Sequence, residues 1–460
     1  MIRKLIKLAL SGVVLANSTY GINLTIPNSL QNNMSVMAID TKTNKVVYQH
    51  LPNTPRLIAS NMKLITTAVG LEQLHPDFKW HTKLFYKGTI NNGVLDGDLY
   101  ILGGGDPTLD DRALTEIFSN LQKLGIKKIS GNLVIDNTIF NSIPTYSMLK
   151  VENYDIDTVF PDGLILDANK TIFNIHIKAN TPTIDNNLYG YNINNNLRVD
   201  PREHSCSDLS HQVSFKESTV TFSGKISQAC NNQKLEFNMI DTKSYTKMAL
   251  SRTLNNLSIE LKGNIVYQNI PDKAILIYDY SSQSLEDAMV YMNHYSVNII
   301  AETIFLSLGA FTTDNKHTYK NSQDIYYSFM KKLNMLNPNF RIENGAGLSR
   351  TESVTALGMV NLLKYENDSQ YAAIFEKTLP QSGLEGSLKN HFTKFGHRAK
   401  FKTGTLNDTH AYSGYFLSRH GTKYIVTAIA NNINTNNPSQ MTKFNGFVTT
   451  LLDKLDTKNK

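Results

Sequence analysis

Hydrophobic and polar residues change their period along the chain, and these changes divide it into a first, a middle and a last part. In the first part, residues 35–40 and 45–49 are rich in β-forming residues around a Thr-Lys-Thr-Asn turn, which predicts a hairpin. Residues 60–74 carry apolar side chains at helical spacing and end before a His-Pro pair. The pattern predicts a β-hairpin followed by a helix.

The middle part, residues 82–283, is rich in Asn and Thr and has only short apolar runs. Short strands are predicted at residues 98–102, 129–135 and 274–278. A helix is predicted at 110–124, so residues 98–135 are predicted to form a small α/β unit. The Asn- and Asp-rich residues 181–211 are predicted to be a loop or a subdomain edge.

Helical periodicity returns after residue 284. Helices are predicted at 285–294 and 299–308, and strands at 399–402, 411–417 and 424–430. The last two strands form a hairpin, and a final helix carries one apolar stripe, made of Met441, Phe444, Phe447, Leu451 and Leu455. We expect the N-terminal and C-terminal hairpins to share one sheet. Residues 22–81 and 284–460 are then one discontinuous domain, and residues 82–283 are an insertion of two nested subdomains.

Charge and composition exclude some classes of function. The chain has 460 residues, of which 41% are hydrophobic, and a formal charge of +7. The positive charge is spread without a run of five Lys or Arg residues, which disfavours a nucleic-acid-binding patch. The His residues lack compact ligand spacing, so neither a metal site nor a cofactor is expected.

Residues 1–21 have the pattern of a secretory signal. Arg3, Lys4 and Lys7 precede a short apolar stretch, and small residues follow it. Export to the periplasm is therefore expected, with an uncleaved anchor as the alternative. Cys206 and Cys230 are the only cysteines, and in an oxidising compartment they either form one disulfide or stay unpaired.

Ser60 and Lys63 are candidates for a nucleophile and its base. A serine hydroxyl needs a base within hydrogen-bond reach, and residues three apart on a helix share a face. The S-x-x-K spacing alone is common, and three other pairs share it, beginning at Ser147, Ser244 and Ser328.

Two further motifs select among these pairs. Ser296-Val297-Asn298 lies between two predicted helices, where a turn would direct both polar side chains into a cleft. Lys402-Thr403-Gly404 ends a predicted strand, and a substrate backbone could approach Gly404 closely. Ser130-Gly131-Asn132 is a second S-x-N, whereas Lys-Thr-Gly occurs once.

The order Ser60, Ser296-Val-Asn298, Lys402-Thr-Gly resembles that of the penicillin-binding protein and serine β-lactamase superfamily. The Ser328 pair falls in the wrong order, and the other two pairs lie in the insertion. The chain as a whole resembles the D-alanyl-D-alanine carboxypeptidases/endopeptidases of peptidase family S13, the penicillin-binding protein 4 group. The supporting stretches are residues 59–67, 102–109, 292–302, 344–350, 379–383 and 402–406.

The resemblance implies a fold, an activity and a set of roles. The fold is an α/β (α+β) transpeptidase-like domain, an antiparallel sheet flanked by helices, with a large insertion. The activity is a serine-type D-Ala-D-Ala carboxypeptidase and DD-endopeptidase, which acts on peptidoglycan stem peptides and cross-links and reacts covalently with β-lactams. Ser60 would carry the acyl group, Lys63 would take its proton, and Ser296 would relay a proton. Asn298 would hold the substrate amide, Lys402 with Thr403 would bind the carboxylate side, and Gly404 is also assigned to substrate binding. The N–H groups of Ser60 and Thr405 would form the oxyanion hole.

Val297 replaces the usual Asp of S-D-N, which leaves the two residues with assigned chemistry in place. Two alternative functions stay open. One is a serine β-lactamase, although an E-x-x-L-N-like segment is missing from the sequence. The other is a catalytically silent exported protein of the same fold. A loose association with the membrane or with cell-wall proteins is a further prediction.

Overall fold

The first and last parts of the chain meet in one antiparallel sheet, as the sequence predicts. Its strands are β1 (Met34–Asp40), β2 (Val46–His50), β18 (Ala399–Leu406), β19 (Thr409–Leu417) and β20 (Lys423–Asn431). The strand order is β18-β19-β20-β1-β2, which places the N-terminal hairpin beside the C-terminal strands. Met34 pairs with Ala430 and Asp40 with Tyr424, so β1 and β20 align over the full length of β1.

The computed structural model describes residues 21–141, 143, 161–206, 209, 212–216, 218–238, 240–314 and 316–458. The predicted signal, apart from Gly21, and the Ser147 motif lie outside the described residues. In the described part, no helix is both long enough and apolar enough to cross a membrane.

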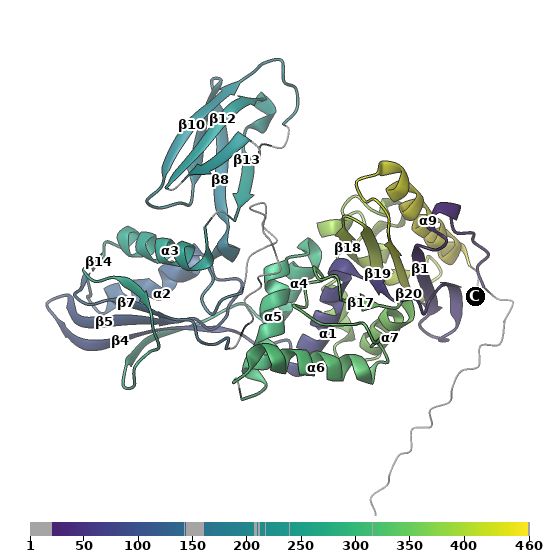
Figure 1. Cartoon of the computed structure of the whole chain (residues 1–460), viewed down its shortest axis with the longest axis horizontal. Helices are drawn as coiled ribbons and strands as arrows, with labels where there is room; N and C mark the ends of the chain where they lie inside the picture. Colours follow the sequence, from purple (N-terminus) through teal and green to yellow (C-terminus); the bar gives the residue numbers. More distant parts are fainter. Residues whose placement is uncertain are drawn as a thin grey trace, which may run out of the picture.

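Helices cover both faces of the five-stranded sheet (Figure 1). Their bounds are α1 (Met62–Gln73), α4 (Leu285–Tyr295), α5 (Asn298–Phe311), α6 (Thr318–Lys332), α7 (Ala356–Asn367), α8 (Ala372–Lys377) and α9 (Pro438–Thr457). The predicted stripe of α9 packs on one face, with Phe444 and Leu451 fully buried. Alternate strand residues such as Ile425 and Ile429 face the other side, where α1 and the remaining helices lie.

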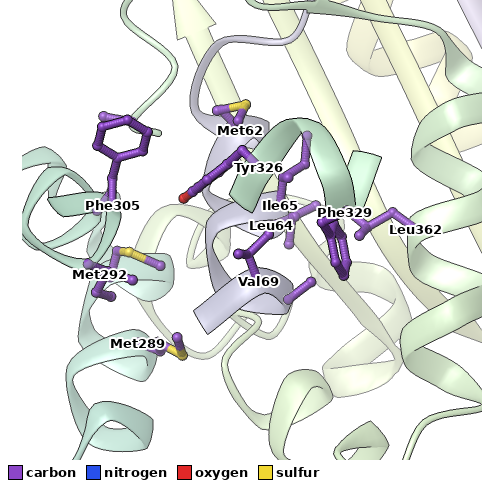
Figure 2. Close-up of a cluster of buried hydrophobic side chains, with 14 of the residues drawn as sticks. Met62, Leu64, Ile65, Val69, Met289, Met292, Phe305, Tyr326, Phe329 and Leu362 are labelled. Atoms are coloured by element: carbon purple, nitrogen blue, oxygen red, sulfur yellow. The ribbon is translucent and has the colours of Figure 1, made fainter. Parts of the chain in front are cut away.

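Helix α1 is buried around its whole circumference rather than along one stripe. Ten of its twelve residues are buried. Side chains of α4, α5, α6 and α7 surround it, including Met289, Phe305, Phe329 and Leu362 (Figure 2). A short strand, β3 (Arg56–Leu57), leads to this helix and pairs with β17 (Ser353–Val354). The polar residues that α1 carries are thereby placed inside the protein.

The inserted region begins and ends on two paired strands, β4 (His81–Asn91) and β16 (Ile275–Ser281), in which His81 lies opposite Ser281. The other strands of this sheet are β5 (Val94–Leu102), β6 (Lys128–Ile129), β7 (Leu133–Asp136), β14 (Glu260–Leu261) and β15 (Ile265–Tyr267). Helices α2 (Asp111–Lys123) and α3 (Thr242–Asn256) pack with the sheet in one core. The parallel pairing of β5 with β6 and β7 across α2 agrees with the predicted α/β unit. The domain limits at residues 82 and 283 stay a prediction.

The prediction of a single strand at 129–135 is wrong, because the structure has two strands there, β6 and β7. At the break, the N–H of Asn132 donates to the Asp98 carboxylate at 2.6 Å. A Cβ on Gly131 would lie 2.5 Å from the carbonyl oxygen of Gly97. The close approach of the β5 backbone therefore bends the chain at Gly131.

A second, smaller β unit projects from the inserted region (Figure 1). Its two sheets have the orders β13-β8-β9 and β10-β12-β11. The bounds are β8 (Thr171–Lys178), β9 (Thr181–Asn186), β10 (Asn192–Val199), β11 (Val213–Lys216), β12 (Thr219–Ile226) and β13 (Gln233–Phe237). The two sheets share a core that includes Phe173, Phe222 and Phe237.

Residues 181–211 were predicted to be a loop or a subdomain edge, and the first of these alternatives is wrong, because the range contains β9 and β10. Asn disfavours strands. Strand β10, however, pairs in parallel with β12 along its whole length, from Asn192 opposite Thr219 to Val199 opposite Ile226. The backbone hydrogen bonds of this ladder do not depend on the side chains, and Leu197 packs into the core. Tertiary pairing outweighs the local preference here.

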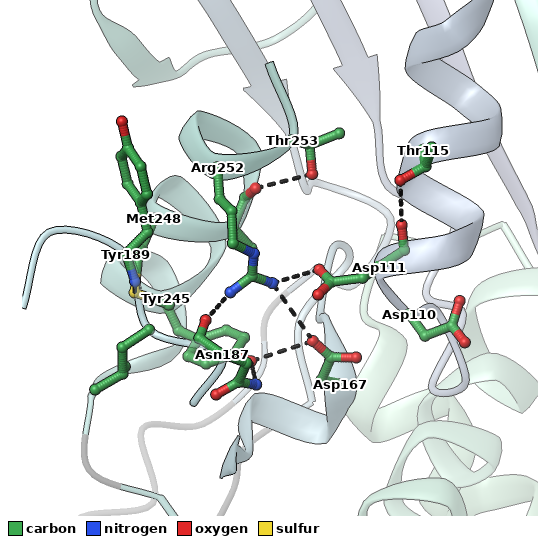
Figure 3. Close-up of polar contacts among 12 residues, drawn as sticks. Asp110, Asp111, Thr115, Asp167, Asn187, Tyr189, Tyr245, Met248, Arg252 and Thr253 are labelled. Atoms are coloured by element: carbon green, nitrogen blue, oxygen red, sulfur yellow. Dashed lines mark hydrogen bonds and ion pairs between the residues drawn. The ribbon is translucent and has the colours of Figure 1, made fainter. Parts of the chain in front are cut away.

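A polar cluster joins the small β unit to α2 and α3 (Figure 3). The Arg252 guanidinium donates to the Asp111 carboxylate and to the carbonyl of Asn187. The Tyr245 hydroxyl donates to Asp167 at 3.1 Å. Burial and the nearby Asp111 raise the pKa of Asp167 to about 6. The cluster fixes the base of the small unit on the α/β unit.

Cys206 and Cys230 form a disulfide within the small β unit, which answers the question that the sequence left open. Cys230 lies in the core of the unit. The bridge therefore closes a loop of 24 residues next to the aromatic core.

Replacing both cysteines with serine is expected to lower the stability of the small unit by about 2–4 kcal/mol, because the loop gains freedom in the unfolded state. Urea unfolding followed by circular dichroism measures this loss. Trp80 is the only tryptophan of the chain, and it is buried in the core around α1. Its fluorescence transition should keep its midpoint, and an equal shift of both transitions would contradict the local effect.

Candidate active site

Ser60 lies in a 3-10 turn, Ala59–Asn61, that runs directly into α1. The sequence predicts a helix that starts at Ser60, whereas α1 begins two residues later, at Met62. Ala59 has φ of 46°, a left-handed conformation that turns the chain sharply before Ser60. The turn leaves Ser60 half-buried at the N-terminal end of the buried helix α1.

Lys63 connects three separate segments. Its Nζ lies 3.1 Å from Ser60 Oγ and donates to Asn298 Oδ1 at 2.5 Å and to the carbonyl of Ala346 at 2.7 Å. The side chain is completely buried. The structure thus brings together the predicted nucleophile, in the 3-10 turn, and the predicted base, in the first turn of α1.

Ser296 and Asn298 lie where α4 ends and α5 begins. Ser296 is the C-terminal cap of α4 and has φ of 60°. Asn298 is the first residue of α5. This tight turn directs the Asn298 amide toward Lys63 and the Ser296 hydroxyl toward Lys402.

Lys402 reaches the same place from β18. Its Nζ donates to Ser296 Oγ at 2.9 Å and to the carbonyl of Thr403 at 2.8 Å. Burial and the nearby charge of Lys63 lower the pKa of Lys402 well below its usual range. The approach of an anion such as a carboxylate would stabilise the charged form of Lys402.

Gly404 packs against the turn that carries Ser60, and its predicted part in substrate binding stays a prediction. A Cβ there would lie 2.8 Å from the carbonyl oxygen of Ile58 and 3.0 Å from the nitrogen of Ser60. The absence of a side chain thus lets β18 lie directly against the Ser60 turn. Thr405 follows, exposed, and its hydroxyl contacts His410 Nδ1 at 2.8 Å on the paired strand.

Two contributors were missed by the sequence analysis. The carbonyl of Ala346 contacts Lys63, although the stretch 344–350 had no chemical role assigned to it. His410 orients the Thr405 hydroxyl. A pair of glycines around Ala346 is a signal for a close backbone approach, whereas His410 carries no distinctive local pattern.

The competing motifs lie elsewhere. Ser244 and Lys247 are on α3, in the inserted region. Ser328 and Lys331 are on the outer helix α6. Ser130-Gly131-Asn132 forms the break between β6 and β7.

The arrangement fits acyl transfer to a serine. Ser60 has an amine beside its hydroxyl, Lys402 offers a site for an anion, and the N–H groups of Ser60 and Thr405 belong to two segments in close contact. A nucleophile, a base and backbone donors are the parts that such chemistry needs.

Comparison with known proteins agrees with this geometry. The model of the D-Ala-D-Ala carboxypeptidase 3 (S13) family matches residues 23–451. The chain is 24% identical over 430 residues to D-alanyl-D-alanine carboxypeptidase DacB of Haemophilus influenzae, covering 90% of this chain and 88% of that protein. It is 24% identical over 406 residues to D-alanyl-D-alanine carboxypeptidase of Actinomadura sp. strain R39, covering 84% and 75%.

Solved structures show the same fold. The crystal structure of penicillin binding protein 4 (dacB) from Haemophilus influenzae matches with a TM-score of 0.76 at 22% identity, covering 94% of this chain and 98% of that one. Another crystal structure of the same protein, complexed with a β-lactam, matches with a TM-score of 0.73. The predicted fold class is confirmed.

Proposed function

Since this chain belongs to the D-Ala-D-Ala carboxypeptidase 3 (S13) family and is a serine-type carboxypeptidase acting on peptidoglycan, we propose that its acyl-enzyme forms on Ser60. One observation carries the proposal. The amine of Lys63 lies within hydrogen-bond distance of Ser60 Oγ and also contacts Asn298. Ser296, two residues before Asn298, contacts Lys402, so the three motifs meet at one place.

Acylation transfers the peptide from D-Ala to the serine. Lys63 takes the hydroxyl proton while Ser60 Oγ attacks the carbonyl carbon of the penultimate D-Ala. The N–H groups of Ser60 and Thr405 stabilise the oxyanion. The C–N bond then breaks, and the leaving amine receives a proton relayed through Ser296, so that free D-Ala departs.

Binding of the terminal carboxylate is assigned to Lys402 and Thr403. Burial and the nearby charge of Lys63 lower the pKa of Lys402 and so disfavour its charged form. An incoming carboxylate would stabilise the charged form. Asn298 holds the substrate amide while remaining bonded to Lys63.

Water completes the cycle by attacking the acyl carbon and releasing the shortened stem peptide. The same acyl-enzyme would form if the leaving amine belonged to a second stem peptide, which is the endopeptidase reaction on cross-links. A β-lactam would acylate Ser60 through opening of its ring amide, and its leaving group stays attached. The complex of the Haemophilus influenzae protein with a β-lactam supports this part of the proposal.

We also propose that the protein is exported to the periplasm. The pattern of residues 1–21 and the Cys206–Cys230 disulfide support export, because disulfides persist in oxidising compartments. A loose association with the membrane or with cell-wall proteins stays a prediction.

Incubation with purified muropeptides tests the function. The mature protein is given monomeric pentapeptide and cross-linked dimer in separate reactions, and products are followed by mass. Loss of one alanine from the monomer establishes the carboxypeptidase, and conversion of dimer to monomers establishes the endopeptidase. In parallel, a lasting adduct with fluorescent penicillin is expected; rapid turnover would indicate a β-lactamase instead, and no labelling would indicate a silent protein.

A further inference from the structure

The proposed mechanism gives no role to the contact between Lys63 and the carbonyl of Ala346. This carbonyl lies on residues 343–347, named here the 343–347 loop, and accepts from Lys63 Nζ at 2.7 Å. Together with the contact to Asn298, this contact fixes the position of Nζ, 3.1 Å from Ser60 Oγ.

Helix α1 fixes one side of the 343–347 loop. Thr66 Oγ1 donates to the carbonyl of Gly345 at 2.6 Å, and the Tyr326 hydroxyl donates to Thr66 at 2.8 Å. Gly347 has φ of 90°, and a Cβ there would lie 2.0 Å from the carbonyl oxygen of Ala59. The loop therefore packs directly on the turn that carries the nucleophile.

Glu352 fixes the opposite side. Its Oε1 accepts from the N–H groups of Glu343 at 3.0 Å and Asn344 at 3.3 Å. The Asn344 side chain in turn accepts from the N–H of Ala346 at 3.0 Å and donates to Glu302 at 2.8 Å. Glu352 is 1% exposed, and within the described residues its Oε2 has no hydrogen-bond partner.

We propose that Glu352 is a positioning residue for acyl transfer, which acts through the 343–347 loop to hold the Ala346 carbonyl on Lys63. The inference rests on the proposed roles of Ser60 and Lys63. The chain of contacts runs from Glu352 to the N–H of Asn344, from the Asn344 side chain to the N–H of Ala346, and from the Ala346 carbonyl to Lys63. Without the carboxyl acceptor, two N–H groups of the loop lose their partner, and the loop must move to find others.

The buried carboxyl of Glu352, which has no cationic partner among the residues that the structure describes, also predicts a difference in pH dependence between the wild type and Glu352→Gln. Burial is the main cause that raises the pKa of Glu352 to about 7, and the charge of Glu343 adds to it. The other titratable groups that face it are Tyr326 of α6 and Glu302, which it reaches through Asn344. The backbone donors of the loop act in the opposite direction.

The sign of the pH effect follows from the two states. In the unfolded chain a Glu ionises near about pH 4.3. Between that value and about pH 7 the folded protein holds a proton that the unfolded chain has lost, so stability falls as pH rises through this window. Glu352→Gln cannot ionise. The melting temperature of the wild type should therefore fall relative to that of Glu352→Gln as the pH is raised across this window.

Acylation kinetics of the full mature chain test the positioning role. With a fluorescent penicillin, Glu352→Ala should lower the maximal acylation rate about tenfold to 100-fold, as misplacement of a reacting group does, with the half-saturating concentration little changed. Glu352→Gln, which keeps the acceptor, should restore the rate to within about threefold of the wild type. An unchanged rate in Glu352→Ala, or no rescue by glutamine, overturns the proposal.

Glu366 supplies a matched control. It is also buried with a pKa raised to about 7, but it lies at the C-terminal end of α7, where Ser369 contacts it. Glu366→Ala should lower the melting temperature without lowering the acylation rate. A parallel loss of rate in this variant would mean that destabilisation alone explains the effect of Glu352→Ala, and would overturn the proposal.

Hydrogen exchange separates this inference from the proposed function. Glu352→Ala should speed exchange at the amides of Glu343, Asn344 and Ala346, and Glu352→Gln should not. Failure of the wild type to react with penicillin would overturn the proposed function, whereas unchanged exchange in Glu352→Ala with a reactive wild type would overturn only the role of Glu352.

Discussion

Ser60→Ala abolishes covalent labelling by fluorescent penicillin, and Lys63→Ala lowers the labelling rate nearly as far. Each loss is expected to lower the rate by about 10⁶-fold, because a nucleophile and its base act as one unit. The close contact of Lys63 Nζ with Ser60 Oγ is the structural reason. For the same reason, the double variant should be no slower than Ser60→Ala alone.

Single-turnover labelling followed by gel fluorescence measures these rates. Ser244 and Lys247 on α3 have the same spacing as Ser60 and Lys63. Ser244→Ala and Lys247→Ala are therefore matched controls that should label at the wild-type rate. Robust labelling of the Lys63→Ala protein would remove Lys63 from its assigned role, and labelling of Ser60→Ala would point to another nucleophile.

Gly404→Ala lowers the acylation rate about 10²- to 10³-fold, the effect expected when one oxyanion-hole donor is lost. The added methyl group would lie 2.8 Å from the Ile58 carbonyl oxygen and 3.0 Å from the Ser60 nitrogen. Both neighbours are backbone atoms, so the turn and β18 must separate. This separation would pull the N–H groups of Ser60 and Thr405 away from a shared oxygen.

The same labelling assay, with thermal unfolding in parallel, measures the effect. Gly446 on α9 has no atom within 4 Å of the position of an added Cβ, so Gly446→Ala is a control that should leave the rate unchanged. Wild-type labelling of Gly404→Ala would show that the contact between β18 and the Ser60 turn does not set the reaction geometry.

The sequence was sufficient for the parts of the site that lie in ordered motifs. Ser60, Ser296 and Lys402 were predicted to converge, and Lys63, Asn298 and Lys402 make the contacts that bring their segments together. The contact between Lys63 and the carbonyl of Ala346 could not be predicted in this way. Any residue supplies a backbone carbonyl, and this one lies 283 positions from Lys63 in the sequence.

Glu352 illustrates a second limit. Carboxylates are mostly exposed, so an acidic residue in a polar stretch carries no sequence signal of burial. Its environment depends on the 343–347 loop folding back on it, which is a tertiary event. For the fold, the period of the hydrophobic residues was sufficient to predict the helices and the shared sheet. The strands β9 and β10 were not predicted, because they depend on pairing with other strands rather than on their own Asn-rich sequence.

The pairing of His81 with Ser281 places both attachment points of the inserted region side by side. An insertion of about 200 residues therefore begins and ends at two neighbouring strands, which are only ~5 Å apart. The two attachment strands are thus as close together as those of an ordinary hairpin, and Phe140 and Ile165 of the inserted region also pack into the core around α1. Evolution can therefore change the length of the insertion with little effect on the surroundings of the nucleophile, as long as the packing of Phe140 and Ile165 is kept.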